Sequence, residues 1–299
     1  MKINKEKINC KICNSQNLRV YMEHPAIMYC NNCKNAFRVG KSLQIDELYL
    51  KGISMPNYFE ATIRNRHHYD FIESSIGFDK IENILEIGSG NGSFLRFIRN
   101  RHKNIKITAV EPGINFGKEL NRIENVTVIN EFIEKAKIEE RFDLVIMSHI
   151  LEHIEEPQQT INFIYKNILK STGSLYIDVP NKDYELRNVS GAMRAPQIHL
   201  FFFGGDGIKN VLKNAGFDEK HIFGNKYSTL PLDFILRSEK ISNLNSTKRF
   251  KLAQLKIFNL ISLQFSDFIK LFFKMRPKTI ALEATDFRYN NMAVIAKMK

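Results

Sequence analysis

Short apolar runs recur along the middle of the chain. Five of them are typical of buried β-strands, because they are brief and rich in branched side chains; they cover residues 83–88, 105–112, 126–130, 142–148 and 174–180. Amphipathic stretches lie between them, including 157–172, where Pro157 suits a first helical turn. Strands that alternate with helices predict a parallel, doubly wound α/β sheet, which binds ligands at the carboxyl ends of its strands.

Segments on either side of these strands complete the predicted domain plan. Residues 1–45 contain all the cysteines and form a small first domain. Residues 46–80 are predicted to be helices that connect it to the main domain, residues 81–299. Helical spacing is clearest in 57–76, with a shorter helix expected around 45–50. A helical insertion is predicted at about 228–288. Its apolar, lysine-flanked part, 250–278, is expected to pack in the core, cap a pocket or form a homodimer face, with peripheral membrane contact as the alternative.

The composition narrows the class of protein. The 299 residues are 43% hydrophobic, enough for a sizeable core and too many for a disordered chain. A formal charge of +12 favours anionic partners, although the abundance of Lys, Ile and Asn along the whole chain offers compositional bias as an equal explanation. The first residues lack the apolar core of a signal peptide, and no run approaches the ~20 apolar residues of a spanning helix. We therefore expect a cytoplasmic protein.

Four cysteines near the start predict a metal site. Cys10 and Cys13 form one C-x2-C pair, and Cys30 and Cys33 form a second pair sixteen residues later. Two such pairs supply the four thiolates of a closed tetrahedral zinc site, the pattern of a zinc ribbon. Since a closed site leaves no coordination position for a substrate, the zinc is expected to be structural. Disulfides and a redox role are the less favoured alternatives.

A glycine-rich turn follows the first of the five strands. Glu86 lies near the end of the run, and Gly88, Gly90 and Gly92 follow at every second position, which differs from the dinucleotide fingerprint G-x-G-x-x-G. A carboxylate here would repel a pyrophosphate and suit a ligand with an ammonium group. Glu111 ends the second strand and can accept hydrogen bonds from both hydroxyls of a ribose. A ribose and a cationic, phosphate-free tail describe S-adenosylmethionine.

These residues resemble the class I S-adenosylmethionine-dependent methyltransferases. The similarity covers residues 57–225 and rests on "LEIGSGNGSFL", "AVEP", "RFDLVIMSHILEHIEEP", "LKSTGSLYIDVPN" and "IHLFFFGGDGIKNVLKNAGF". It implies a Rossmann-like sheet of seven strands, the last of which, "NMAVIAKM", runs antiparallel to the others. The nearest resemblance is to bacterial methyltransferases with an N-terminal zinc ribbon, including sugar methyltransferases.

The resemblance implies roles for individual cofactor residues. The three glycines let the backbone approach the cofactor, Glu86 orients the methionine ammonium and Glu111 binds the ribose. Glu131 and Phe132 are assigned to the adenine, with a plain helix-start acid as the alternative for Glu131. Ser148 and His149 border the methionine moiety and the transferring methyl group.

Histidines near the strand ends are the candidates for catalysis. A hydroxyl acceptor is a poor nucleophile until it loses its proton, and a histidine is the natural base. His149 or His199 is expected to fill this role, with a packed or cofactor-contacting histidine as the alternative for each. His149 and His153 would share a face of a helix, which admits a metal site, but a structural role for His153 is favoured. His67, His68, Arg64 and Tyr58 precede the core on one helix and are weaker candidates to cover the cofactor.

Three functions remain open from the sequence. The favoured one is methyl transfer to a hydroxyl of a sugar or nucleotide-linked sugar in surface-glycan or related biosynthesis. An RNA base methyltransferase is the alternative, although the [DNS]-P-P-[YFW] motif is replaced by residues 148–151, "SHIL", and the main domain lacks a cysteine nucleophile. The third is a non-catalytic binding module. Nucleic acid is thus an unfavoured partner, and a small-molecule or glycan acceptor is favoured.

Overall fold

The computed structural model describes residues 8–23, 26–40, 58–186, 188–189, 192–193, 198–229, 279–283 and 289–298. The expected helix at 45–50, and the 250–278 segment for which dimer or membrane contacts were expected, lie outside the described residues. Among the helices that the structure does describe, none combines the length and the hydrophobicity needed to span a lipid bilayer.

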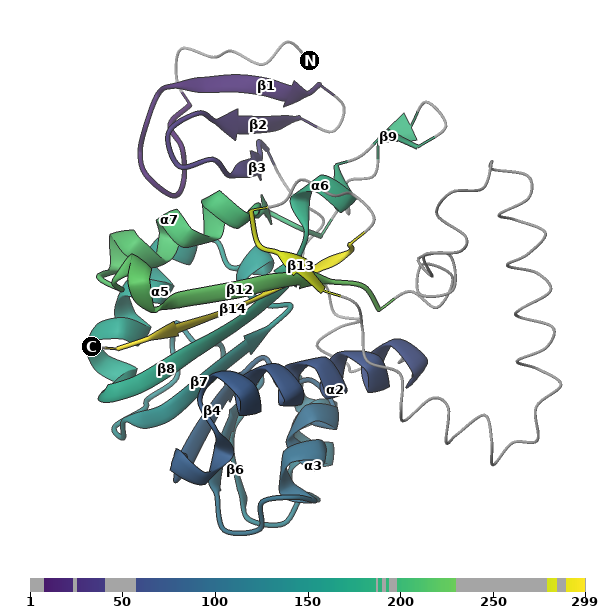
Figure 1. Cartoon of the computed structure of the whole chain (residues 1–299), viewed down its shortest axis with the longest axis vertical. Helices are drawn as coiled ribbons and strands as arrows, with labels where there is room; N and C mark the ends of the chain where they lie inside the picture. The colour runs from purple at the N-terminus through teal and green to yellow at the C-terminus, as the bar shows by residue number, and fades with distance from the viewer. Residues whose placement is uncertain are drawn as a thin grey trace, which may run out of the picture.

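An eight-stranded sheet forms the centre of the molecule (Figure 1), in the order β13-β12-β14-β8-β7-β4-β5-β6. The strands are β4 (Asn83–Ile87), β5 (Lys106–Val110), β6 (Val126–Ile129), β7 (Phe142–Ser148), β8 (Leu169–Pro180), β12 (Ile222–Tyr227), β13 (Thr279–Ala281) and β14 (Asn291–Lys297). Strands β8, β7, β4, β5 and β6 are parallel to one another. Strand β14 is antiparallel to both β8 and β12, which confirms the predicted α/β fold and its reversed last strand.

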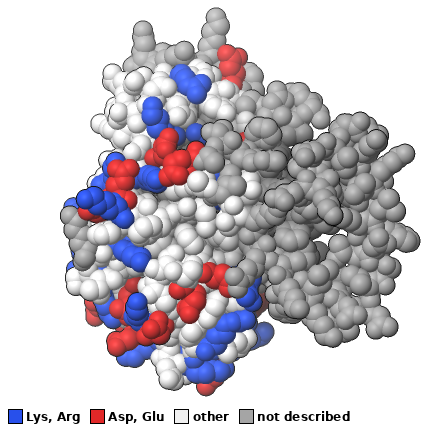
Figure 2. All heavy atoms as spheres, in the orientation of Figure 1, with Lys and Arg blue, Asp and Glu red and all other residues white. Residues whose placement is uncertain are grey.

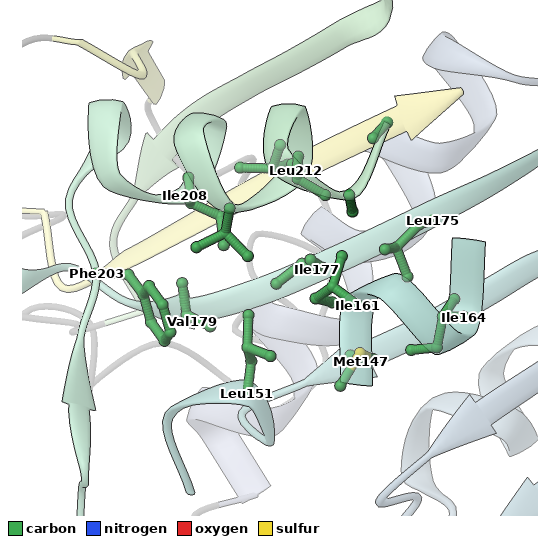
Figure 3. Close-up of a cluster of buried hydrophobic side chains, with 14 of the residues drawn as sticks. Met147, Leu151, Ile161, Ile164, Leu175, Ile177, Val179, Phe203, Ile208 and Leu212 are labelled. Carbon is green, nitrogen blue, oxygen red and sulfur yellow. The ribbon is translucent and has the colours of Figure 1, made fainter. Parts of the chain in front are cut away.

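Helices cover both faces of this sheet. They are α2 (Tyr58–Ser75), α3 (Ser93–Arg99), α4 (Ile114–Leu120), α5 (Pro157–Phe163), α6 (Lys182–Glu185) and α7 (Gly205–Ala215), with shorter helical turns at Phe78–Lys80, Leu151–His153, Ile164–Ile168 and Glu219–His221. Side chains alternate between the faces along each strand. Leu175, Ile177 and Val179 of β8 therefore pack under α5 and α7 (Figure 3), whereas Tyr176 joins the cluster under α2 and α3.

Two sequence predictions about this core are corrected. The helix predicted over 157–172 ends at Ile168, because Leu169 turns to an extended backbone and pairs with Phe142 as the start of β8. The sheet has one strand more than the seven predicted, because β13 adds an edge strand beside β12 inside the segment expected to be helical. In both places long-range strand pairing overrides the local helical pattern.

The cysteine-bearing segment forms a second, small sheet. Its strands β1 (Leu18–Met22), β2 (Ile27–Cys30) and β3 (Ala36–Arg38) are antiparallel, and β3 also pairs with β11 (Phe201–Phe202) of the main domain. A two-stranded hairpin, β9 (Asn188–Val189) with β10 (Ala192–Met193), precedes β11. The ribbon lies above α7 in Figure 1, and Met28 and Phe37 join the core cluster that α7 covers.

Basic and acidic groups are interspersed on the molecular face drawn in Figure 2. On this face the net charge of +12 is not gathered into a single basic surface.

Candidate functional site

The glycine turn lies at the carboxyl end of β4. Gly88, Gly90 and Gly92 all have positive φ, at 70°, 51° and 73°, a conformation that glycine adopts with little strain. A Cβ on Gly88 would lie 2.0 Å from Cδ1 of Ile150, so the turn packs closely on the segment that follows β7. A Cβ on Gly90 would meet no atom of the described residues within 4 Å, so this side of the turn is open in the described structure.

Two acidic residues stand beside this turn. The carboxylate of Glu111 is fully buried and accepts hydrogen bonds from the backbone N–H groups of Gly90, at 2.7 Å, and Gly113, at 2.8 Å. Glu86 is 3% exposed, and its Oε2 has no hydrogen-bond partner among the described residues. Burial raises the pKa of Glu111, and burial raises the pKa of Glu86 to about 8. The turn therefore holds one carboxylate in place and leaves an oxygen of the other unpaired.

The other predicted cofactor residues lie at neighbouring strand ends. Glu131 and Phe132 follow β6, where the Oε1 of Glu131 accepts a hydrogen bond from the Phe132 amide, and Phe132 is 44% exposed. Ser148 ends β7 and is half-buried. Strands β5, β4 and β7 separate β6 from β8, so the predicted cofactor residues follow the carboxyl edge of the sheet.

His149 occupies a strained position after β7. Its φ is 55°, in the left-handed region that few residues other than glycine adopt, and such strain is concentrated at functional sites. Its Nε2 lies 3.2 Å from Oδ2 of Asp178, and its Nδ1 lies 3.4 Å from Oε1 of Glu152. Burial and the charge of Arg64 lower the pKa of His149, but the two carboxylates outweigh them and raise it to about 9. The imidazole is thus a cation held between two acids at neutral pH.

Asp178 is the fully buried centre of a polar network on β8. Its Oδ2 also accepts a hydrogen bond from the Tyr227 hydroxyl at 2.9 Å and lies 3.1 Å from Nε2 of His68. Burial opposes ionisation, but His68 and His149 hold the pKa of Asp178 well below its usual range. His67 stacks on Tyr227 at 3.6 Å, so the helix α2 inserts its two histidines against β8 and β12.

His199 lies in the loop before β11, as predicted. Its Nδ1 is 2.7 Å from Oε1 of Glu185, which is 6% exposed and whose pKa is raised by burial. The ring of His153 meets the His199 ring edge to face, with centroids 4.8 Å apart. Nε2 of His153 lies 3.8 Å from Oε1 of Glu152. His149, His153 and His199 thus surround two buried acids.

The predicted helical face shared by His149 and His153 is not present. The turn of 3-10 helix covers only Leu151–His153, and His149 lies before it in the left-handed conformation. Both histidines instead face the same oxygen, Oε1 of Glu152, at 3.4 Å from Nδ1 of His149 and 3.8 Å from Nε2 of His153. Sequence reasoning did not single out Glu152, Glu185 or Asp178. An acid at the end of an apolar strand was a usable signal for Asp178, whereas Glu185 is next to His199 only through the fold.

The four cysteines come together as predicted. The Sγ atoms of Cys10 and Cys33 are 3.5 Å apart, and those of Cys13 and Cys30 are 3.6 Å apart. All four Sγ atoms lie within 4.8 Å of one another, and none of the four cysteines is in a disulfide. A tetrahedral zinc with bonds of ~2.3 Å places its sulfurs ~3.8 Å apart, so the donor set fits zinc.

Comparison with protein families decides the class of this chain. The family described as "Methyltransferase domain" matches residues 59–221, more than half of the chain. The chain belongs to this methyltransferase family. The matched range includes the glycine turn, Glu111 and the histidine cluster, by which we mean His67, His68, His149, His153 and His199 with the acids Glu152, Asp178 and Glu185.

Individual relatives are more distant. The chain is 29% identical over 140 residues to malonyl-[acyl-carrier protein] O-methyltransferase 2 of Ilyobacter polytropus, with 44% of this chain and 52% of the relative covered. It is 28% identical over 151 residues to the malonyl-[acyl-carrier protein] O-methyltransferase of a Paenibacillus species, with 45% and 54% covered. The chain therefore spans about half the length of these relatives.

Solved structures confirm the methyltransferase fold. The plantazolicin methyltransferase BpumL, in complex with a triazolic substrate analogue and SAH, has a TM-score of 0.51 at 13% identity, covering 81% of this chain and 86% of that one. Its complex with a pentazolic analogue gives 0.50 at 14% identity with the same coverage. At this identity the likeness is one of fold.

Proposed function

We propose that this chain is an S-adenosylmethionine-dependent methyltransferase that binds its cofactor at the glycine turn. The observation that carries the proposal is the buried, unpaired Oε2 of Glu86 beside a turn whose Gly90 faces open space. An ammonium group is the partner that this oxygen lacks. The ribose would bind to Glu111, and the adenine would lie near Glu131 and Phe132. When bound, the cofactor supplies a methyl group on a sulfonium, which is electrophilic.

Calorimetric titration with S-adenosylmethionine tests this assignment. We expect micromolar binding by the wild type and binding at least 100-fold weaker in Glu111→Ala, because hydrogen bonds to a charged acceptor contribute about 1.5–3 kcal/mol each. Glu119→Ala changes an exposed glutamate on the nearby helix α4 and is the matched control. A folded wild type that does not bind the cofactor would contradict the proposal and favour a non-catalytic binding module.

We infer that the acceptor group is a hydroxyl. Such a group must lose its proton as its oxygen forms the new bond to carbon, while the carbon–sulfur bond breaks with its electron pair on sulfur. The histidines and acids beside the cofactor turn are suited to this step. Both ring nitrogens of His149 already face carboxylates, so it acts as a fixed cation. His199 is therefore the histidine we place at the acceptor, together with Glu152 and His153.

Fewer observations bear on which molecule carries the acceptor group. A sugar or nucleotide-linked sugar remains the candidate from the sequence resemblance, but the relatives do not support it. The names of these relatives specify malonyl-[acyl-carrier protein], which favours a carboxyl acceptor as the second candidate. A carboxylate needs no base, so the two candidates differ in their need for His199. Nucleotide sugars and malonyl-[acyl-carrier protein], assayed side by side for methylated product by mass spectrometry, distinguish the candidates; an RNA substrate tests the remaining alternative.

We also propose that the four cysteines hold a structural Zn²⁺. Its support is the closeness of the four sulfurs, with one cysteine pair before β1 and the other at the turn from β2 to β3, in a segment with little core of its own. Such segments gain much of their folding free energy from the metal. Cys13→Ser should lower the zinc content and the stability of the ribbon, whereas Ser15→Ala on the same turn should leave both unchanged. Equal zinc content in wild type and Cys13→Ser would contradict this site.

A further inference from the structure

Glu152, His153 and His199 converge on one point outside the cysteine site. The ligand atoms that they can offer all lie within 4.8 Å of one another. A metal with bonds of ~2.0–2.2 Å to nitrogen and oxygen holds its ligand atoms no more than ~4.4 Å apart. The upper bound on the observed separations exceeds that limit by about 0.4 Å.

Both histidines have one ring nitrogen already fixed by a neighbour. Nδ1 of His153 lies 3.1 Å from the backbone carbonyl of Ile198, and Nδ1 of His199 lies 2.7 Å from Oε1 of Glu185. Metal-binding histidines almost always donate their second N–H to a carbonyl or carboxylate in this way, which fixes the ring and leaves the other nitrogen unprotonated. The Nε2 atoms of His153 and His199 are thus the expected ligands.

Glu152 supplies an independent observation, because its Oε1 faces Nδ1 of His149 at 3.4 Å and Nε2 of His153 at 3.8 Å, both longer than a well-formed hydrogen bond. It is 1% exposed, and neither of its carboxylate oxygens has a hydrogen-bond partner among the described residues. A buried carboxylate without hydrogen bonds is costly, and such groups are found paired or bound to metal. The backbone also fixes the ligands relative to one another, because the Leu200 amide donates to the carbonyl of Glu152 at 2.9 Å.

We propose that Glu152, His153 and His199 bind a divalent metal ion, with Glu185 orienting His199. Two imidazoles and one carboxylate suit Zn²⁺, Fe²⁺, Mn²⁺ or Co²⁺ and leave coordination positions open. The inference deepens the proposed function and rests on it for its role: a hydroxyl bound to the ion has a lowered pKa and releases its proton to water before it accepts the methyl group. In this arrangement His199 is a metal ligand and does not itself take the proton.

Cobalt binding to the full chain tests the proposal. The cysteine site is first saturated with zinc, and Co²⁺ is then titrated while the absorption spectrum is followed. Cobalt bound by nitrogen and oxygen gives weak visible bands, whereas displacement of zinc from the cysteines gives intense thiolate charge-transfer bands. We expect one equivalent of Co²⁺ with the weak bands only. Mn²⁺ titration, followed by loss of the resonance signal of the free ion, gives an independent affinity.

Variants assign the binding to these residues. Glu152→Gln and His199→Asn should each weaken Co²⁺ binding at least 100-fold, and Glu185→Gln should weaken it about 10–100-fold, as expected for a residue that orients a ligand. His221→Asn changes a histidine in the turn before β12 and should bind as the wild type does. The affinity for S-adenosylmethionine, measured on each variant, verifies folding. Where Glu152→Gln fails to fold, Glu185→Gln decides.

Two results would overturn the metal site. One is a wild type that takes up no Co²⁺ or Mn²⁺ at millimolar concentration, and the other is uptake that His199→Asn and Glu185→Gln leave unchanged. The proposed function fails separately. Methyl transfer that survives chelation of the weakly bound metal refutes the metal's role and leaves hydroxyl methylation standing. Metal uptake without methyl transfer to any hydroxyl acceptor refutes hydroxyl methylation and leaves the metal site standing.

Discussion

The glycine turn and the histidine cluster handle buried carboxylates in opposite ways. At the turn, Oε2 of Glu86 has no partner in the described structure, and the pKa of this residue is raised to about 8. In the cluster, Asp178 lies against His68, His149 and Tyr227, and its pKa is held low. The first region needs a cation from outside the protein, whereas the second supplies its own. Binding and stability should therefore respond differently to mutation in the two regions.

The largest expected effect is at Asp178. In Asp178→Asn the charge of His149 loses its buried partner, and breaking a buried pair on one side costs about 3–5 kcal/mol in the free energy of unfolding. Chemical denaturation measures the change. Glu219→Gln alters an exposed ion pair with Lys213 and should leave the free energy of unfolding nearly unchanged. Equal losses in the two variants would remove the distinction between the network and an ordinary ion pair.

At Glu86, removal of the carboxylate is expected to raise the stability of the ligand-free protein, the opposite of the effect at Asp178. Below pH 4.5 this residue is protonated in both states, and between pH 4.5 and about 8 only the unfolded state ionises, so the stability of the ligand-free protein falls as pH rises through this window. Glu86→Gln should abolish that slope and stabilise the ligand-free protein by about 2–4 kcal/mol at pH 8. It should also weaken cofactor binding. Thermal unfolding at several pH values, with calorimetry, checks both; a variant less stable than the wild type at pH 8 would disprove the assignment.

Substitutions of two glycines in the turn should distinguish residues needed for packing from residues needed for cofactor binding. Gly88→Ala places a Cβ against Ile150 at positive φ and should lower stability by about 2–3 kcal/mol. Gly90→Ala adds its methyl group to open space and should cost only about 1–2 kcal/mol of backbone strain. Its main effect should be on cofactor affinity, because the open side is where the cofactor is proposed to lie. Denaturation measures the stability of both variants, and calorimetry measures their affinity for the cofactor. Unchanged affinity in Gly90→Ala would argue against placing the cofactor on this side of the turn.

The smallest effect concerns the link between ribbon and cluster. The guanidinium of Arg38 on β3 donates to the carbonyl of His199 at 3.1 Å. Arg38→Met keeps the apolar stem but loses this bond, and it should lower kcat about tenfold, which corresponds to ~1.4 kcal/mol, with cofactor affinity unchanged. Arg19→Met, on β1 of the same sheet, is the control. A parallel loss in both variants would indicate general loosening of the ribbon.

The cofactor side was predictable because its signals are local. Glu86 and the three glycines lie within seven residues of sequence, and Glu111 ends the next strand along the chain. The two C-x2-C pairs are equally compact, and their four sulfurs meet as the spacing predicts. The reversed last strand is confirmed as well, although it rested on family resemblance and not on any pattern in its own residues.

The histidine cluster was only half predictable because the fold assembles it. His149 and His199 were singled out. However, the partners of His199 come from other parts of the chain, Glu185 from α6 and His153 from the helical turn after β7. Helical spacing wrongly placed His149 and His153 on one face, since a left-handed residue interrupts the helix there. A positive φ at a histidine has no sequence signature. The same limit applies to β13, whose pairing with β12 is invisible to local periodicity.

The pairing of β3 with β11 has a consequence during protein synthesis. Arg38 and His199, which flank this contact, are 161 positions apart, so at about 5–20 residues per second the ribosome takes roughly 8–30 s to supply the partner strand. Through that interval the nascent ribbon exposes an unpaired strand edge, the kind of surface on which chains associate. Slow translation between these two points should therefore lower the yield of folded protein more than equal slowing after residue 203.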